Sequence, residues 1–578
     1  MKNKYSLFTA KIYFYFFVIC LISFTGCSKE FLNQTKTTDL TEENTFSDSA
    51  RSIDFLTQIY SNIDFSFNPA RFNGLAGLES ASDEAEGPTA NTLTTYNQFA
   101  TGSVSAYSIS NDAWSIPYSN IRAVNQFIKH LNIIPYNSDL KRRTKAEAIF
   151  LRAWYYSILL KHYGGVPLIG DTIYSVSGGF NSKRNTYEEC VNYILKECDG
   201  AINDLPSSYT GGDFGRVTKA AAMALKARVL LYAASPLFNG GSIAQAEPLK
   251  SITSYPSPDI ARWKIAADAA KEVIDLSSFH LYEDNTTKPG FGFYQVFQLR
   301  KNSEFIFQRM KDVSSSYHDL ELLWRPPSRG GGSNTGGAPY HNLVDAFQMS
   351  NGKDITDVTS GFIADDPYNN RDPRMNYTIV CNGAPMFFVN SNPKPVYTYV
   401  GEPTGDGLGQ GTPTGYYVNK MCNDDVVPNW FNTTQRCYPL IRYAEILLIY
   451  AEALNEFSGP SQEVYEAVES IRKRAGLNPY SLTAGLSKSE MRSVIQHERQ
   501  VEFAFEEQRF WDVRRWKIAV QTDNQPMSGI NIVPVGSNKF SYSSFNVRTH
   551  IFRESMYLWP IPQSETAKSV DLLQNPGY

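Results

Sequence analysis

The chain has 578 residues, of which 42% are hydrophobic, and this is enough to bury a large core. It is too long for one simple domain, although a helical array of this size can form a single unit. The net charge is −4 with no basic block, which argues against nucleic-acid binding. Tyrosine and phenylalanine each occur 35 times, an excess that suits a surface binding flat or ring-shaped ligands.

The N-terminus predicts secretion and lipid attachment. Three lysines precede an apolar run, Ile12–Phe24, which is too short to span a bilayer. Small residues stand directly before Cys27, an order that resembles a bacterial lipobox. We therefore expect residues 1–26 to be a lipoprotein signal peptide and Cys27 to carry lipid, which anchors a chain without spanning the membrane. The alternative, an ordinary secretory signal with a chance cysteine, fits this order less well.

The first part of the expected mature chain is poorly patterned. Residues 27–44 are polar and lack periodicity, as in a lipidated tether, and residues 45–578 are predicted to form one unit. A helix is expected at Thr45–Asn62. Residues 66–110 then become rich in Gly, Ser, Thr and Asn, interleaved with aromatic side chains. A loop of this length inside a compact chain is usually functional or disordered.

An acidic cluster lies within this loop. Asp83, Glu84 and Glu86 suit a cation site or a general acid/base pair, or else helix-end charge or a solvated loop. Because no further ligand spacing accompanies them, we favour helix-end charge or a solvated loop.

Apolar residues at helical spacing predict a series of helical pairs within about residues 114–276. The expected pairs are Trp114–Asn132 with Leu140–Tyr163, and Thr186–Leu205 with Arg216–Leu237. A further helix is expected at Trp263–Leu276, and the sequence does not reveal its partner. Aromatic residues within these strongly periodic helices are interpreted as core.

The clearest pattern is a helical hairpin at Leu440–Pro479. Ser461 can cap its second helix, and Gly476 stands just past the end of that helix. Ala467 and Pro479 have the spacing of a tetratricopeptide helix pair, although the turn between the helices is longer than usual. One such hairpin cannot bury its own apolar face, so others should stack on it.

The middle of the chain, residues 283–430, is predicted to be rich in loops and strands. FGFYQVFQL and SEFIFQRM are either short strands or helix ends. Two glycine clusters within residues 330–337 forbid regular structure, and they lack the Gly-Lys-Ser/Thr ending of a phosphate loop. Trp324, Arg325 and Tyr340 flank this run, and exposed aromatic side chains beside a loop are candidate ligand contacts.

The C-terminal part begins with a capping box at Ser487 and Glu490. One long helix should follow and end near Trp516, with ion pairs between its charged residues. His497 and Glu498 do not form the H-E-x-x-H motif of a metalloprotease. The segments SMYLWPIPQSE and LLQNPGY should pack back against the body.

Five cysteines lie beyond the signal region: Cys190, Cys198, Cys381, Cys422 and Cys437. They show no zinc spacing, and we expect most of them to be buried free thiols. Cys422 and Cys437 are also positioned to pair across a loop.

Nine stretches, read in order, resemble the SusD/RagB family of surface nutrient-binding lipoproteins. They are FLRAWYYSILLKHYGGVPLI, GRVTKAAAMALKARVLLYAASP, NLVDAFQMSNGK, NNRDPRM, GYYVNK, LIRYAEILLIYAEALNE, IRKRAGL, HERQVEFAFEEQRFWDVRRW and LWPIPQSE with QNPGY. The resemblance implies a mainly α fold of about four tetratricopeptide-like pairs, with a loop-rich half that carries short strands. It also implies a non-catalytic protein, held by lipid in the outer membrane and facing the cell exterior. The sequence itself shows no metal or cofactor motif and leaves bound cations open. The implied partner is a SusC-like TonB-dependent transporter.

The resemblance further implies an oligosaccharide ligand bound by loops 66–110 and 283–430. Aromatic side chains would stack on sugar faces while polar side chains bond the hydroxyls. The candidate ligand contacts are Tyr96, Trp324, Tyr340, Phe72, Tyr294 and Arg325. The alternatives left open are a binder of peptides or other nutrients, or a mainly structural lid of the transporter.

Overall fold

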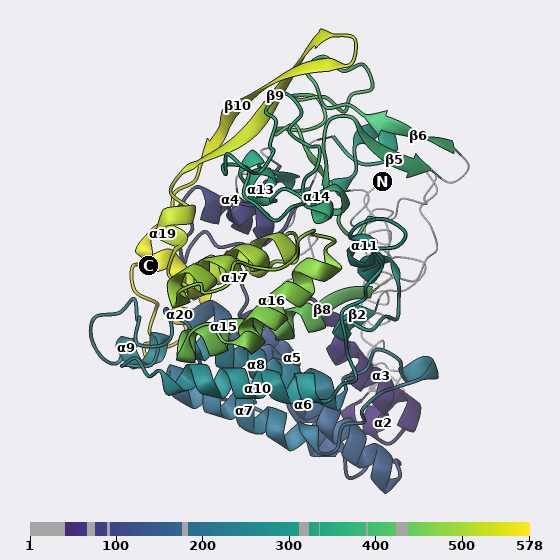
Figure 1. The fold of residues 1–578 in the computed structure, drawn as a ribbon. Coiled ribbons are helices and arrows are strands. Elements are labelled where there is room, and N and C mark those ends of the chain that lie inside the picture. The colour runs from purple at the N-terminus through teal and green to yellow at the C-terminus, as the bar shows by residue number, and fades with distance from the viewer. Residues whose placement is uncertain are drawn as a thin grey trace, which may run out of the picture.

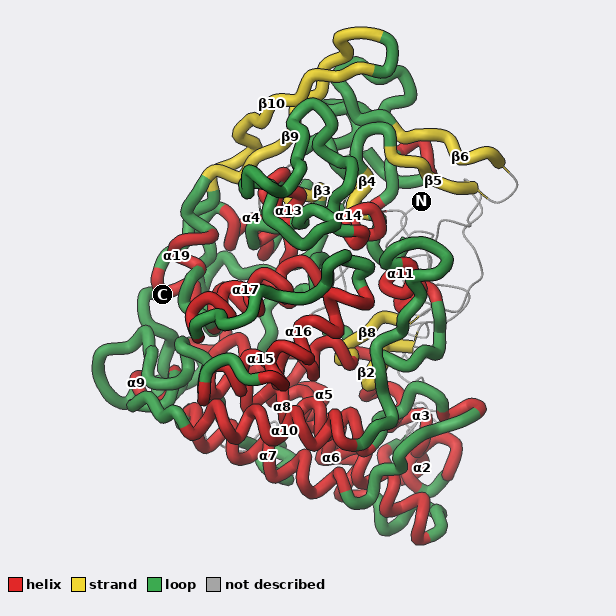
Figure 2. The backbone as a smooth tube through the Cα atoms, in the orientation of Figure 1, coloured by secondary structure: helices red, strands yellow, loops and turns green. Residues whose placement is uncertain are grey.

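The computed structural model describes residues 41–65, 76–88, 93–175, 183–310, 323–333, 336–388, 391–422 and 437–578. Long helices form the lower part of Figure 1, and loops, short helices and strands form the part above them. Figure 2 shows the same division as red tubes below and mostly green and yellow tubes above. The expected fold class, mainly α with a loop-rich half that carries short strands, is confirmed.

The long helices form a body that we call the scaffold. They are α5 (Ser115–His130), α6 (Ser138–Tyr163), α7 (Tyr187–Ile202), α8 (Lys219–Ala234), α10 (Ala261–Asp275), α15 (Tyr443–Ser458), α16 (Gln462–Arg474) and α17 (Lys488–Glu502). From α5 to α8 each helix packs against the next, and α8 packs against α10. Helix α10 also packs against α15, which contacts α16 and α17. The partners of α10 are therefore α8 and α15, and α10 joins two helical segments far apart in the sequence.

Local sequence explains why these helices begin and pack where they do. Helix α8 is buried along almost its whole length, and its many alanines let α7 and α10 approach closely. The predicted capping box at Ser487 and Glu490 is present at the start of α17, and Thr186 with Glu189 forms another on α7. Such caps satisfy N–H groups that the first helical turn leaves without partners.

The predicted hairpin at Leu440–Pro479 is present as α15 and α16. Ser461 occupies the N-cap position of α16, but its side chain makes no capping hydrogen bond, so the expected cap is wrong. Gly476 ends the hairpin with φ +82°, and a Cβ there would lie 2.6 Å from the Gly290 nitrogen. This position therefore requires glycine.

In the described residues the strands form five two-stranded antiparallel sheets. The pairs are β1 (Ala85–Glu86) with β3 (Ala338–Pro339), β2 (Phe305–Met310) with β8 (Cys437–Arg442), β4 (Ile379–Val380) with β7 (Tyr417–Val418), β5 (Ala384–Phe388) with β6 (Ser391–Val396), and β9 (Pro526–Gly536) with β10 (Lys539–Thr549). The first three pairs join distant parts of the chain. Of the two ambiguous segments, SEFIFQRM contains β2, and FGFYQVFQ forms helix α11 (Phe291–Gln298).

Short helices complete the fold. They are α2 (Glu42–Phe46), α3 (Ser49–Ile59), η2 (Tyr60–Asn62), η4 (Leu78–Ala81), α4 (Thr95–Ala100), η5 (Gly211–Asp213), α9 (Leu249–Thr253), η6 (Pro327–Arg329), α13 (His341–Ala346), α14 (Pro373–Thr378), α18 (Gln508–Arg515), α19 (Ala519–Thr522), η7 (Glu554–Tyr557) and α20 (Gln563–Thr566). The single helix expected at Thr45–Asn62 is wrong, because Asp48 accepts a hydrogen bond from the Arg51 nitrogen and starts a second helix there.

The single long helix expected to end near Trp516 is also wrong. The chain breaks between α17 and α18, where Phe505 and Glu507 have positive φ angles of 61° and 57°. The break frees main-chain carbonyls for buried cations. The Lys420 ammonium donates to the carbonyls of Glu502 and Ala504 at 2.9 and 2.8 Å.

Buried ion pairs connect the scaffold to the loop-rich half. They centre on Glu502, which is fully buried. Its carboxylate accepts hydrogen bonds from Arg374 of α14 at 2.9 Å, from Arg442 of β8 at 2.6 Å and from Arg474 of α16. Burial raises the pKa of Glu502, but the charges of Arg474, Arg442 and Arg374 outweigh it and hold that pKa well below its usual range. The ion pairs expected within the C-terminal segment are present, because Asp512 pairs with Arg499 and with Arg515, each at 2.8 Å. The pairs of Glu502 reach three other elements in addition.

Other sequence expectations fall partly outside the described residues. The described residues do not include the predicted signal peptide 1–26, Cys27, most of the tether or Phe72. The five remaining cysteines are free and buried, so Cys422 and Cys437 do not pair. Within the described residues, no helix combines the length and apolar character needed to cross a membrane.

Candidate functional site

The two predicted ligand-binding loops meet at a short sheet. Strand β1 lies in the first loop and β3 in the second, with Ala85 opposite Pro339 and Glu86 opposite Ala338. The Tyr340 nitrogen continues the pairing by donating to the Glu84 carbonyl at 2.9 Å. We call this place, where residues 76–88 lie beside residues 336–340, the loop junction.

The acidic cluster is buried at the loop junction. Asp83 accepts two hydrogen bonds from Arg509 at 2.8 and 2.7 Å, and Glu86 accepts from Arg548, most closely at 2.6 Å. The interpretation as helix-end charge or a solvated loop is therefore wrong, because these carboxylates are partners of buried or half-buried arginines. In the part of the chain that the structure describes, no group of three or more His, Cys, Asp or Glu side chains is arranged to hold a metal.

Among the described residues, the Glu84 carboxylate accepts a single hydrogen bond, from the Phe505 nitrogen at 3.3 Å. No arginine of these residues is hydrogen-bonded to it. Burial, followed by the charges of Asp83 and Glu79, raises its pKa well above the ordinary value, whereas Arg509 lowers it. Raised carboxyl pKa values are typical of general acids as well as of structural sites. Here Glu84 is fully enclosed, which leaves a substrate no access to it.

Tyr340, a candidate ligand contact, is also enclosed. Its hydroxyl donates to Glu86 and lies 3.2 Å from His550 Nε2. Burial, with a smaller contribution from Arg548, lowers the pKa of His550 to about 4, so the imidazole is neutral at pH 7. The arrangement fixes the Tyr340 ring in place and uses its polar atom internally.

Trp324 borders a small cavity of about 20 Å³ at the loop junction. Its lining residues are Glu86, Gly87, Pro88, Trp324, Gly336, Gly337, Ala338, Gly411, Thr412, Pro413, Tyr417 and Val418. The indole N–H of Trp324 is buried and has no hydrogen-bond partner among the residues that the structure describes. A cavity of this size holds roughly one or two water-sized groups, so it can accept a hydroxyl but not a sugar ring.

Glycines allow the main chain to pass against these aromatic rings. A Cβ on Gly336 would lie 2.7 Å from the Trp324 ring, and one on Gly87 would lie 2.5 Å from the Tyr96 ring. The glycine-rich segment therefore serves close packing at the loop junction.

The expectation that Trp324 and Tyr340 are exposed beside this segment is wrong. Their exposed fractions are 4% and 0%, and those of Tyr96 and Arg325 are 1% and 2%. Tyr96, Trp324 and Tyr340 do come together at the loop junction, but as part of its walls.

Tyr294 has a different environment. It is half-buried on α11, and its ring lies 5.6 Å from Phe291 and 5.7 Å from Tyr377 of α14. All three rings are partly exposed, so together they offer apolar surface to a ring-shaped ligand. The sequence analysis missed Phe291 and Tyr377. The only available signal was the run of aromatic residues in FGFYQVF.

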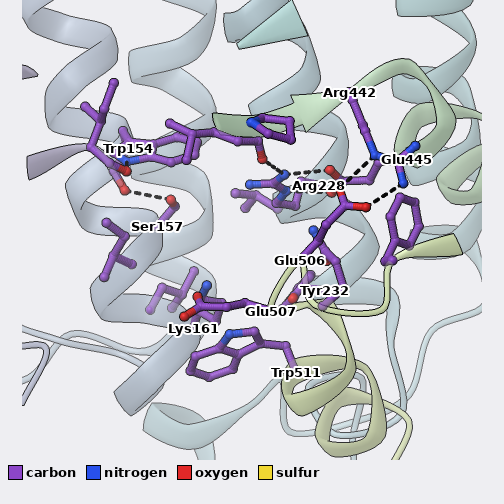
Figure 3. A pocket seen from close by; sticks show the side chains of 18 of the residues that line it. Trp154, Ser157, Lys161, Arg228, Tyr232, Arg442, Glu445, Glu506, Glu507 and Trp511 are labelled. Carbon is purple, nitrogen blue, oxygen red and sulfur yellow. Dashed lines mark hydrogen bonds and ion pairs between the residues drawn. The ribbon is translucent and has the colours of Figure 1, made fainter. Parts of the chain in front are cut away.

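A second cavity, of about 90 Å³, lies between α6, α8, β8 and the link from α17 to α18. Figure 3 shows Trp154, Tyr232 and Trp511 at its border together with charged side chains. Arg228 pairs with Glu445 at 2.6 Å, and Arg442 pairs with Glu506 at 2.7 Å. Binding pockets for small molecules usually measure about 300–1,000 Å³. This cavity is smaller and its arginines are already paired, so it does not suit a sugar chain.

Comparisons with known proteins agree with this fold. A sequence profile described as "SusD family" matches residues 293–578, and one described as "Starch-binding associating with outer membrane" matches residues 30–231. The chain belongs to the SusD/RagB family. Proteins of this family bind carbohydrates and associate with the outer membrane.

Individual relatives of this SusD-family chain are distant in sequence. "SusD-like protein P2" of Formosa agariphila is 23% identical over 486 residues, covering 82% of this chain and 81% of the relative. A crystal structure of a SusD-like protein from Bacteroides fragilis is 27% identical with a TM-score of 0.77, covering 93% of this chain and 99% of that one. Another B. fragilis structure, titled a SusD-like carbohydrate binding protein, is 23% identical with a TM-score of 0.72, covering 92% and 100%.

Proposed function

We propose that this protein is a cell-surface glycan-binding lipoprotein that captures an oligosaccharide and delivers it to a SusC-like TonB-dependent transporter. Membership of a carbohydrate-binding family supports the ligand class. The observation that carries the placement of the site is the loop junction, where both predicted loops meet around an indole N–H without a partner.

The binding mechanism divides the candidate residues into two groups. Trp324 donates its indole N–H to one sugar oxygen that enters the small cavity, while Tyr294 with Phe291 and Tyr377 offers ring faces to the apolar sides of sugars. Tyr96, Tyr340 and Arg325 are buried, and Tyr96 and Tyr340 form part of the packing at the loop junction. Phe72 stays a candidate contact from the first loop.

Substitution of Trp324 by phenylalanine tests the site. After a glycan array identifies a ligand, calorimetry should show an affinity for Trp324→Phe lower by about five- to tenfold, the worth of one hydrogen bond to a sugar oxygen. Trp559→Phe is the matched control, because its indole N–H is also buried without a partner but lies in the core cluster of the scaffold. Equal affinities for wild type and Trp324→Phe would refute the placement.

The protein is proposed to bind its glycan without cleaving it. The carboxyl groups at the loop junction with raised pKa values, Glu79 and Glu84, are buried and serve the packing of that region. Incubation of the purified protein with its glycan should release no reducing ends over a day. Their release by wild type but not by Glu84→Gln would show catalysis.

The proposed location is the outer face of the outer membrane, with the lipid on Cys27 as anchor. The family description of outer-membrane association supports it. Cys27→Ala should move the protein from the membrane fraction to the soluble fraction, and wild type should co-purify with a large β-barrel protein. An unchanged membrane fraction for Cys27→Ala would exclude this anchor.

A further inference from the structure

A groove on the scaffold is separate from the loop junction. It runs between α10, α15 and α16 and is closed at one side by residues 280–283. These three helices lie side by side in the scaffold, where α15 packs against both α10 and α16 (Figure 1). The groove encloses about 730 Å³, which lies within the usual range of about 300–1,000 Å³ for binding pockets.

Three tyrosines line this groove with their rings half-exposed. Tyr443 and Tyr450 are both on α15, seven residues apart, so they share one face and are separated by about 10 Å along the helix. Tyr282 comes from the segment that follows α10. Tyr443 and Tyr450 pack against the core on one side and border the groove on the other.

The hydroxyls of these tyrosines have no role in the contacts among the described residues. Among the described residues none of the three has a hydrogen-bond partner, although many other tyrosine hydroxyls do. Tyr465 of α16, for example, donates to the Thr483 carbonyl at 3.2 Å and accepts from the Leu486 nitrogen at 2.9 Å. The groove tyrosines therefore offer a ligand both a partly solvent-exposed ring and a hydroxyl that is available for hydrogen bonding.

The remaining groove residues favour a neutral ligand with hydroxyl groups. Glu283, Glu463 and Glu466 are exposed at the groove, and carboxylates accept hydrogen bonds from hydroxyls. The groove also has two basic side chains, Lys271 and His280. Lys271 is paired with Asp275, and Glu283 is paired with Lys473 at 3.5 Å, so Glu463 and Glu466 supply the remaining negative charge. An anionic ligand would meet net repulsion at this surface.

The walls of the groove argue against an extended peptide. Peptides that bind in extended form gain affinity from main-chain hydrogen bonds to an open sheet edge. The long walls of this groove are α-helices, whose main-chain groups bond within the helix. Sugars need no such edge, because aromatic rings stack on their apolar faces and carboxylates bind their hydroxyls.

We propose that this groove is a second carbohydrate-binding site, which takes an extended neutral oligosaccharide. Sugar rings stack on Tyr443 and Tyr450, whose spacing matches about two rings of a chain, and the glutamates of α16 accept from the hydroxyls. The inference rests on the proposed glycan-binding function and adds a second contact to it. Two sites on one chain raise the apparent affinity for a long polymer through effective concentration, while short fragments bind each site separately.

The test is retardation on native gels that contain starch, laminarin, mannan or xylan as neutral polymers, and polygalacturonate or alginate as anionic ones. The variant Tyr443→Ala/Tyr450→Ala should lose about tenfold or more in apparent affinity for the neutral polymer that retards wild type. Ser470→Trp, which fills the groove and keeps both tyrosines, should have the same effect. Tyr480→Ala is the control, because Tyr480 is an exposed tyrosine that does not line the groove.

Calorimetry with short fragments of that polymer separates the two sites. Wild type should bind two fragments, and both groove variants should bind one with the affinity of the Trp324 site. If the groove variants match wild type on the gels, or if only anionic polymers retard wild type, the second site is refuted and the proposed function stands. If no polymer retards wild type, both proposals fail.

Discussion

Substitution of Glu502 by glutamine tests the central ion-pair network. Its carboxylate serves three arginines, and after the change Arg374 keeps Asp372 and Glu498 while Arg442 keeps Glu506. Among the described residues, Arg474 keeps Glu304 alone. Removing one partner of a buried pair costs about 3–5 kcal/mol when the remaining charge is left uncompensated. Because each arginine here keeps another carboxylate, we expect a loss at the lower end of this range, about 3 kcal/mol. Against a usual total stability of about 5–15 kcal/mol, this is a large loss.

Urea denaturation followed by tryptophan fluorescence at pH 7 measures this loss for Glu502→Gln. Glu272→Gln on α10 is the control, because Glu272 is exposed, and it should change the free energy of unfolding by less than about 0.5 kcal/mol. A loss below about 1 kcal/mol for Glu502→Gln would show that the three arginines do not depend on this carboxylate.

The pH dependence supplies an independent check of Glu502. Its pKa in the folded state lies below that in the unfolded state, so its stabilisation is fully present above the unfolded value of about 4.3. That stabilisation is lost as the pH falls through the folded pKa. The difference in stability between wild type and Glu502→Gln should therefore shrink below about pH 4. A difference that stays constant down to pH 2 would contradict the assignment.

Two further substitutions and one labelling experiment test other parts of the structure. Burial raises the pKa of Asp523 to about 7, although the charge of Arg514 opposes this, so the folded protein loses stability as the pH rises from about 4 to 7. Asp523→Asn should remove this loss, so that the melting temperature changes less with pH across that window. A pH dependence of the melting temperature equal to that of wild type would contradict this. Gly87→Ala should destabilise by about 1–3 kcal/mol through its clash with Tyr96, whereas Gly200→Ala, which meets open space within α7, should stabilise slightly; equal melting temperatures would refute the clash. The five buried cysteines should not react with a thiol reagent until urea unfolds the chain, and rapid reaction of the native protein would contradict their burial.

Sequence periodicity located the scaffold because each helix carries its own signal. An apolar face, a capping box such as Ser487 with Glu490, and a terminal glycine such as Gly476 all lie within one segment. The prediction failed for helix ends that depend on residues far away in the sequence. The break after α17 accommodates Lys420, which stands more than 80 residues earlier in the chain.

The surroundings of the loop junction were not predictable for the same reason. Asp83 and Glu86 looked like solvated charges because their partners, Arg509 and Arg548, stand more than 400 residues away. Trp324 beside a glycine-rich segment looked exposed, yet glycines also let a main chain cover an aromatic ring. Composition placed aromatic residues in the loops correctly, but exposure is decided by pairing between distant segments.

The same long-range contacts explain why so many charges are buried between the two halves. Replacing a buried ion pair by apolar side chains is often neutral or stabilising, so stability alone does not account for the network. Apolar contact is non-directional, and the loop-rich half has few long strands or helices to fix its orientation. Glu502 can satisfy α14, β8 and α16 together only in one relative placement of those elements. The network therefore acts as a positional constraint, holding the loops that carry the proposed ligand site at a fixed place on the scaffold.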